Sequence, residues 1–189
     1  MAAPHNTPVF SIDGAKIYPM TSDTGAMPPV YGTGVVVPAI RTTGFSPDIV
    51  SKELFGDNAV IARAAKTRQI TAGLEFGKWD LDIYKILLGT AAIVDSGTAN
   101  AEVSTLTIIG ADQPGYFKLE YRVLGVDLGL GNISSVNVTL FKCKITSMDL
   151  PLTMEDFGIP SCEIAAVATG NTVPTFGSIA FNETAAALT

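Results

Sequence analysis

Few residues of this sequence have the types and spacing that catalysis or metal binding requires. Its 189 residues include one histidine, His5, and two cysteines, Cys143 and Cys162. A Ser-His-Asp triad would have to use His5, which lies in a proline-broken N-terminus, whereas a triad is held on rigid elements. A zinc centre needs three or four converging Cys, His or carboxylate ligands. We therefore expect no metal site and no cofactor, and we interpret the cysteines as buried free thiols.

Two pairs of neighbouring carboxylates remain as candidate acid–base groups. Asp80 and Asp82 lie at the predicted start of a helix, where capping explains them. Glu155 and Asp156 fall in a predicted loop, and no neighbouring group is expected to separate their pKa values. The sequence contains neither a GxSxG nucleophile elbow nor a Walker A loop. We therefore expect no catalytic residues and no enzyme activity.

The composition indicates a protein whose surface is covered by partners. Only 16% of the residues are charged and 47% are hydrophobic, whereas about 25% charged residues is typical. The net charge of −6 argues against a protein that grips nucleic acid through phosphate contacts. The N-terminus lacks the pattern of a signal peptide, and no segment approaches the ~20 apolar residues of a membrane span. These features predict an oligomer that is made in the cytosol and has no membrane contact.

The pattern of apolar residues predicts a mainly β (α+β) fold in one domain, residues 1–189. Residues 35–168 are expected to form the core, flanked by extended arms at residues 1–34 and 169–189. Disorder is the alternative for residues 22–34, and a loose end is the alternative for the C-terminal arm. In the N-terminal arm, short strands around a turn at Asp13–Gly14 are a hairpin signal. In the core, alternation from Thr67 to Phe76 and from Phe117 to Val123 indicates strands with one buried and one wet face.

One segment has a convincing helical pattern, at residues 80–88. Asp80 is the expected N-cap and Gly89 the expected C-terminal stop, and residues 90–101 are expected to form a loop. The remaining β-branched runs predict a β-sandwich or barrel of about six to seven antiparallel strands with this one flanking helix. Because charges are few, the sheet edges are poorly defended against pairing with another copy.

Two blocks of the sequence contain short motifs in a characteristic order. In residues 46–89, a charged strand, a Gly-Asp turn and an alternating strand precede the pattern GK-x-x-L-D-x-x-x-x-L-x-G, which is carried by Gly77, Lys78, Leu81, Asp82, Leu87 and Gly89. Residues 114–168 contain YFKLE, then V-x-V-x-L-x-K-x-K, then F-G-x-P-S. Over residues 35–168, this order resembles the major tail tube proteins of long, non-contractile-tailed bacteriophages.

The resemblance implies a structural protein of the virion tail, present in the host cytoplasm during assembly. Its subunits would join laterally into hexameric rings that stack into a tube and conduct DNA during ejection, with the fold shared by inner tubes of contractile tails and type VI secretion systems. The implied partners are further copies of the chain, the tape-measure protein, the tail terminator and distal tail proteins. DNA would pass without specific binding.

Two other classes of protein remain as alternatives to a tail tube subunit. One is another virion β protein, such as a tail terminator or a head decoration protein. The other is a cytosolic ligand-binding β-barrel, which would be an unrelated monomer.

Polar strand faces are the candidate lining of such a channel, because an acidic wall repels DNA and lets it slide. The lumen candidates are Thr67, Gln69, Thr71, Glu75, Lys118, Glu120 and Arg122. The span from Pro47 to Lys66 is the expected ring-stacking loop, with the candidate contact residues Asp48, Lys52, Glu53, Asp57, Asn58 and Arg63. Ordinary solvent exposure and an ordinary long hairpin are the alternative interpretations. The two arms are expected to clamp neighbouring subunits.

Overall fold

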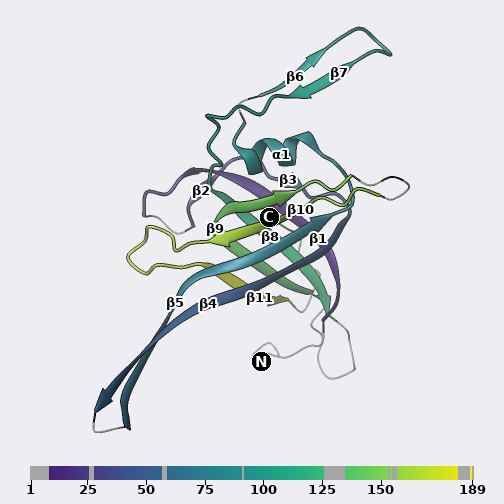
Figure 1. The fold of residues 1–189 in the computed structure, drawn as a ribbon. Coiled ribbons are helices and arrows are strands. Elements are labelled where there is room, and N and C mark those ends of the chain that lie inside the picture. Colours follow the sequence, from purple (N-terminus) through teal and green to yellow (C-terminus); the bar gives the residue numbers. More distant parts are fainter. Residues whose placement is uncertain are drawn as a thin grey trace.

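Strands dominate the structure, a computed structural model that describes residues 9–25, 28–56, 59–90, 92–125, 135–152, 154, 157–182 and 188 (Figure 1). The strands are β1 Val9–Ser22, β2 Val30–Tyr31, β3 Val35–Val36, β4 Ile40–Gly56, β5 Ala59–Phe76, β6 Ile93–Ser96, β7 Val103–Leu106, β8 Phe117–Gly125, β9 Ser135–Asp149, β10 Ser161–Ala166 and β11 Gly177–Asn182. Among the described residues, one helix, α1 Leu81–Leu88, interrupts them. The predicted mainly β fold with one flanking helix is confirmed.

Nine of the strands form one antiparallel sheet that bends around the core. Its order is β2-β1-β8-β9-β10-β5-β4, with β3 paired to β1 and β11 paired to β9. β1 and β4, which lie near opposite ends of this path, approach each other, because their starts line a common groove that includes Val9, Ile12 and Ile40. β6 and β7 form a separate two-stranded sheet that projects beyond α1 (Figure 1). The large sheet thus bends toward a barrel.

The inner face of the bent sheet and one side of α1 form a single hydrophobic core. Its largest contributors come from alternate positions of the central strands and from the helix, namely Leu74, Phe76, Ile83, Leu87, Phe117, Leu119, Leu140 and Ile164. Burial of each such side chain contributes about 1.5–3 kcal/mol of stability. The alternation seen in the sequence predicted the inward positions of β5 from Ile70 to Phe76 and of β8 from Phe117 to Val123.

Helix α1 begins and ends at the predicted capping residues. The Asp80 carboxylate accepts hydrogen bonds from the backbone N–H groups of Asp82, at 2.9 Å, and Ile83, at 3.3 Å. Gly89 ends the helix with a φ of 70°, in the left-handed region that glycine adopts at no steric cost. A Cβ at this position would lie 2.3 Å from the carbonyl oxygen of Gln113. Both the conformation and the space therefore require glycine there.

Several segments differ from the prediction. β1 is a continuous strand of 14 residues, so the predicted turn at Asp13–Gly14 is wrong; the chain makes only a register shift there against β8. The predicted loop at residues 90–101 contains β6. β11 lies in the predicted C-terminal arm and pairs with β9. With these and the short strands β2 and β3, the described residues contain eleven strands rather than six or seven.

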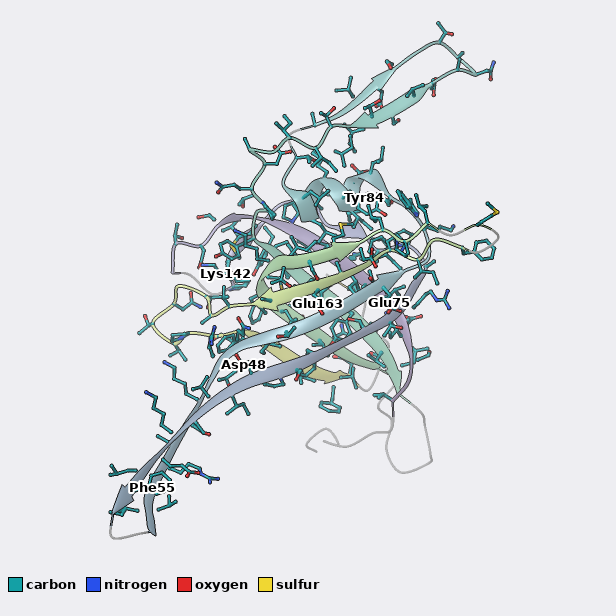
Figure 2. The ribbon with its side chains drawn as sticks, viewed as in Figure 1. Asp48, Phe55, Glu75, Tyr84, Lys142 and Glu163 are labelled. Atoms are coloured by element: carbon teal, nitrogen blue, oxygen red, sulfur yellow. The ribbon has the colours of Figure 1, made fainter. Side chains whose placement is uncertain are left out.

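β4 and β5 form a hairpin that extends past the rest of the sheet. Their pairing runs from Ile40 opposite Phe76 to Gly56 opposite Ala59, whereas β10 pairs with β5 only between Ile70 and Glu75. The distal part of the hairpin therefore projects from the body of the protein (Figure 1). Figure 2 shows Phe55 at the tip of this projection and Glu75 near the other end of the same strand pair.

Candidate assembly surfaces

Four neighbouring strands present one open hydrophilic face on the outer side of the sheet. Cross-strand partners in β4, β5, β10 and β9 lie in rows on this face; one row, for example, joins Thr42, Glu75, Ser161 and Asp149. We call it the acidic face and define it by ten residues that line a shallow groove of about 680 Å³, namely Thr42, Gly44, Ser46, Thr71, Gly73, Glu75, Ser147, Asp149, Ser161 and Glu163. Its side chains are short, except for the carboxylates.

The charge of the acidic face has one sign. Glu75, Asp149 and Glu163 are exposed, and no basic residue lines the groove in the described part of the chain. The Ser147 hydroxyl donates a 3.3 Å hydrogen bond to Glu163 Oε2. Lys144 lies opposite Ala165 at the margin, and its ammonium is 5.5 Å from the Tyr116 ring. The charged side chains that line this groove are therefore all carboxylates.

Two glycines, which have no side chains, make this face flat. Gly44 lies directly opposite Gly73 in the β4–β5 pairing. A Cβ on either residue would meet nothing within 4 Å, so packing within the subunit does not require glycine at these positions. Glycine in a strand interior costs stability and often marks a place where another molecule passes closely. The two glycines are therefore open positions of this face.

The lumen candidates of β5 divide into two groups. Thr71 and Glu75 lie on the acidic face, and Gln69 lies opposite Asp48, farther along the same face. The next partners are Ile49 and Thr67, which leaves Arg68 as an extra residue, a β-bulge. Cross-strand partners share a face, and the neighbours Asp48 and Ile49 point to opposite faces. Their partners, Gln69 and Thr67, therefore also point to opposite faces. The predicted shared face of Thr67 and Gln69 is therefore wrong, because the sequence does not reveal the bulge.

The predicted wet face of β8 is also wrong. Glu120 is 4% exposed, and Lys118 forms a 3.3 Å ion pair with it. The Lys118 ammonium also lies 3.8 Å from the centroid of the Tyr18 ring. Arg122 forms an ion pair with Asp13 of β1. These three charged side chains are held by neighbours within the subunit, and they are not part of an open surface.

The N-terminal segment contacts Lys118 of β8 through Tyr18 and Tyr31, and it also contacts β9. The Tyr31 hydroxyl donates a 2.7 Å hydrogen bond to the carbonyl oxygen of Phe141. Lys142 forms a 2.7 Å ion pair with Asp23, and the Asp23 carboxylate also accepts from the backbone N–H of Gly170. The hydrogen bond from Lys142 holds the pKa of Asp23 below its usual value. Sequence reasoning missed these contacts because their partners lie more than a hundred residues apart.

The projecting hairpin contains the candidate stacking residues that the structure describes. Lys52 and Arg63 are exposed and Asp48 is half-buried at the base. Glu53 lies directly opposite Arg63 and forms an ion pair with it. Asp57 and Asn58 lie outside the described residues. Lys52, Lys66 and Arg68 line a second open groove with Val50, Ala64 and Ala65.

Two exposed apolar patches lie outside the acidic face. The tip patch, at the end of the hairpin, consists of Leu54, Phe55, Val60 and Ile61, with exposed fractions of 49–68%. The loop patch lies between β9 and β10 and next to the start of α1, and it consists of Trp79, Leu152, Met154 and Phe157. Soluble monomers rarely expose such concentrations of large apolar side chains, which mark interaction sites.

The described residues hold no candidate metal centre, and their two thiols are buried. They contain no group of three or more His, Cys, Asp or Glu side chains placed to hold a metal ion. Burial raises the pKa of the Cys143 thiol to about 12 and that of the Cys162 thiol to about 12. Both cysteines are free and buried, as predicted. Among the described helices, none has the length and apolar character needed to cross a bilayer.

Comparison with known proteins gives little likeness to this chain. No family model matches the sequence, and no curated protein matches it. Among solved structures, a chain of the cryo-EM structure of the anti-feeding prophage baseplate aligns with 93% of this chain and 97% of its own length, at 12% identity and a TM-score of 0.41. A similarity of that size supports no conclusion about function, which must come from the surfaces described above.

Proposed function

We propose that this protein is a structural subunit of a phage tail tube and that its acidic face lines the DNA channel. The observation that carries the proposal is the outer face of β4, β5, β10 and β9. It is open, built of short polar side chains, and charged by Glu75, Asp149 and Glu163 with no basic residue in its groove among those described. Such a wall repels the phosphates of a passing duplex, so DNA slides past it without binding.

The edge of the sheet supplies a route for lateral assembly. β4 has 17 residues and is the last strand of the sheet order. One side of it therefore offers unpaired backbone groups, and Phe45 and Ile49 are exposed on it. Long apolar edges are hazards in a monomer, whereas in an assembly they pair with a neighbour. Lateral pairing in a hexameric ring, with β4 at the joint, removes this hazard.

The projecting hairpin supplies a route for axial assembly. Its tip patch is solvent-exposed in the single subunit, and it lies farther from the body than any other part of β4 and β5 (Figure 1). Contact with the next ring would bury these side chains. The tape-measure protein, tail terminator and distal tail proteins are the further partners that this function requires, and the virion is its location.

Negative-stain electron microscopy of the purified protein, alone and in virions, tests this function. We expect rings of six subunits that stack into tubes with a stain-filled channel. Closed single rings at all concentrations would instead indicate a tail terminator, and particles bound to capsids a head decoration protein. A stable monomer in light scattering, with density in neither the tail nor the capsid, would exclude these virion roles and favour a ligand-binding barrel.

A further inference from the structure

We infer that a groove on the β4–β5 hairpin binds the phosphate backbone of duplex DNA. This basic groove has a volume of about 400 Å³ and is lined by Val50, Lys52, Ala64, Ala65, Lys66 and Arg68. Along β4 it lies between Asp48 and Phe55, which are both labelled in Figure 2. The inference rests on the proposed tail tube function, which brings a duplex past this side of the sheet, and it adds a site of attraction to a wall that otherwise carries carboxylates.

The basic groove continues the acidic face along the same two strands. Alternate residues of a strand share a side, and β4 has no extra residue in its pairing with β5 between Ser46 and Lys52. Ser46 of the acidic face therefore shares a side with Val50 and Lys52, and Lys66 joins them because it lies opposite Val50. Six residues of extended strand separate Ser46 from Lys52, about 20 Å. If the acidic face lines the channel, the basic groove lies beside it on the same wall.

The two sides of the hairpin differ in how their charges are balanced. On the side opposite the basic groove, Glu53 lies directly across from Arg63 and forms an ion pair with it. On the side of the groove, the residues across from the two lysines are Val50 and Ala64. The three cations of the groove form no ion pair with another described residue. Because the two lysines are diagonal neighbours and repel each other, an anion from outside would stabilise this side.

One carboxylate lies near the basic groove. Asp48 precedes Val50 by two residues on the same side of β4, and it is half-buried opposite Gln69. With Asp48 counted, the three cations still leave a net positive charge. Lys52, Lys66 and Arg68 are exposed, so their long side chains can extend from the apolar floor to phosphate oxygens. Contacts to phosphates carry no sequence information, so we expect binding that is independent of base sequence.

The geometry of the proposed ring favours a duplex over an acidic protein as the occupant. A hexameric ring would place six basic grooves around the channel axis. Double-stranded DNA carries one phosphate per about 1.7 Å of its axis and presents phosphates in every direction. Every copy of the groove can therefore meet an anion at any position of the duplex, whereas an acidic protein segment would have to match each groove separately.

The salt dependence of DNA binding tests the groove in the unassembled subunit. Anisotropy of a short fluorescent duplex is measured with dilute subunits over a range of low salt concentrations. The logarithm of the association constant should fall with the logarithm of salt with a slope of about −2 to −3, because each phosphate contact contributes about −0.9. Lys66→Gln should reduce this slope by about 1, and the combined Lys52→Gln, Lys66→Gln and Arg68→Gln variant should bind at least about tenfold more weakly. Lys78→Gln makes the same charge change as Lys66→Gln at an exposed residue beyond the other end of β5, and it should leave the slope unchanged.

Three results would overturn the inference. The first is a failure of native subunits to bind the duplex at the lowest salt, and the second is unchanged binding by the combined variant. The third is binding of poly-glutamate as tight as that of the duplex, which would assign the groove to an acidic protein. Native protein that forms tubes but gives any of these results leaves the tube function intact. Native protein that forms no tubes overturns the proposed function, and the inference with it.

Discussion

Glu75 of β5 and Glu163 of β10 project from the same outer face, and their positions along the paired strands differ by two residues. Glu75 lies opposite Ser161, and Glu163 lies opposite Gly73. Diagonal neighbours of this kind have Cα atoms about 7–8 Å apart. Like charges at that spacing cost stability, yet no basic residue separates them in the groove that the described residues form. Their arrangement is understandable if the face must repel a polyanion.

Charge reversal at Glu75 tests the placement of this face in the channel. In Glu75→Arg phage, tails should assemble with normal length, because Glu75 lies in neither apolar patch, but DNA ejection should slow and infectivity should fall. The introduced guanidinium, repeated around each ring, would bind phosphates of the passing duplex. Ejection kinetics and plaque titre are the measurements. Glu102→Arg makes the same charge change on an exposed residue beside β7 and should be silent; normal infectivity of Glu75→Arg would remove Glu75 from the lumen.

Local patterns in the sequence predicted the parts of the fold that depend on neighbours along the chain. Asp80 and Gly89 bracket α1 because their side-chain and backbone chemistry acts within one turn. The alternation of β5 from Ile70 to Phe76 and of β8 from Phe117 to Val123 gave the inner face correctly, since a period of two follows from the pleat itself. The fold class and the helix were therefore predictable.

Long-range pairing explains what the sequence did not predict. Lys118, Glu120 and Arg122 occupy alternate positions, as the residues of a solvent-exposed strand face do. β8 is nevertheless a central strand, and Tyr18 and other residues of the N-terminal segment cover its outer side. Alternation reveals which side chains share a face, and it says nothing about what covers that face. The bulge at Arg68 was hidden for a similar reason, because it is defined only by the partner strand.

The open glycines lead to a prediction about the stability of the unassembled subunit. Gly73→Ala should raise its free energy of unfolding by about 0.5–1 kcal/mol, because alanine reduces the freedom of the unfolded chain and its Cβ meets nothing within 4 Å. Urea denaturation of dilute subunits measures the change. Gly89→Ala is the matched control and should destabilise the subunit, since its Cβ would lie 2.3 Å from the Gln113 carbonyl oxygen. Equal effects of the two substitutions would contradict this account.

The cap of α1 should contribute measurably to stability. Asp80→Ala removes the acceptor of two backbone N–H groups and should lower the free energy of unfolding by about 1 kcal/mol, the usual effect of losing an N-cap. Asp80→Asn keeps an acceptor oxygen and should retain most of that stability. Chemical denaturation of the three proteins side by side distinguishes capping from the loss of charge, which both variants share.

The two thiols should be unreactive in the folded protein. Burial raises the pKa of Cys143 and of Cys162 to about 12, and the thiolate is the reactive form. Iodoacetamide at pH 8 should therefore leave both unmodified for as long as the fold persists, and mass spectrometry should show two additions after unfolding in urea. Rapid modification of the native protein at either position would show that the core of β9 and β10 opens readily.

The ion pair between Asp23 and Lys142 should make stability depend on acid pH. The hydrogen bond from Lys142, aided by the N–H of Gly170, lowers the folded-state pKa of Asp23 from its ordinary 3.8. A carboxyl group with a lowered pKa adds stability that is complete above its unfolded pKa and is lost as the pH falls through the folded value. Asp23→Asn should therefore be less stable than the native protein at pH 7, and the difference should shrink below pH 3.8.

A double-mutant cycle isolates this pair from other acid-sensitive groups. Native protein, Asp23→Asn, Lys142→Met and the combined variant are unfolded in urea at pH 7 and at pH 2, and the coupling energy is calculated at each pH. Coupling should be present at pH 7 and absent at pH 2, because protonated Asp23 no longer pairs with the ammonium. A coupling of the same size at both pH values would mean that neutral hydrogen bonding, and not the ion pair, fastens the N-terminal segment over β8 and β9.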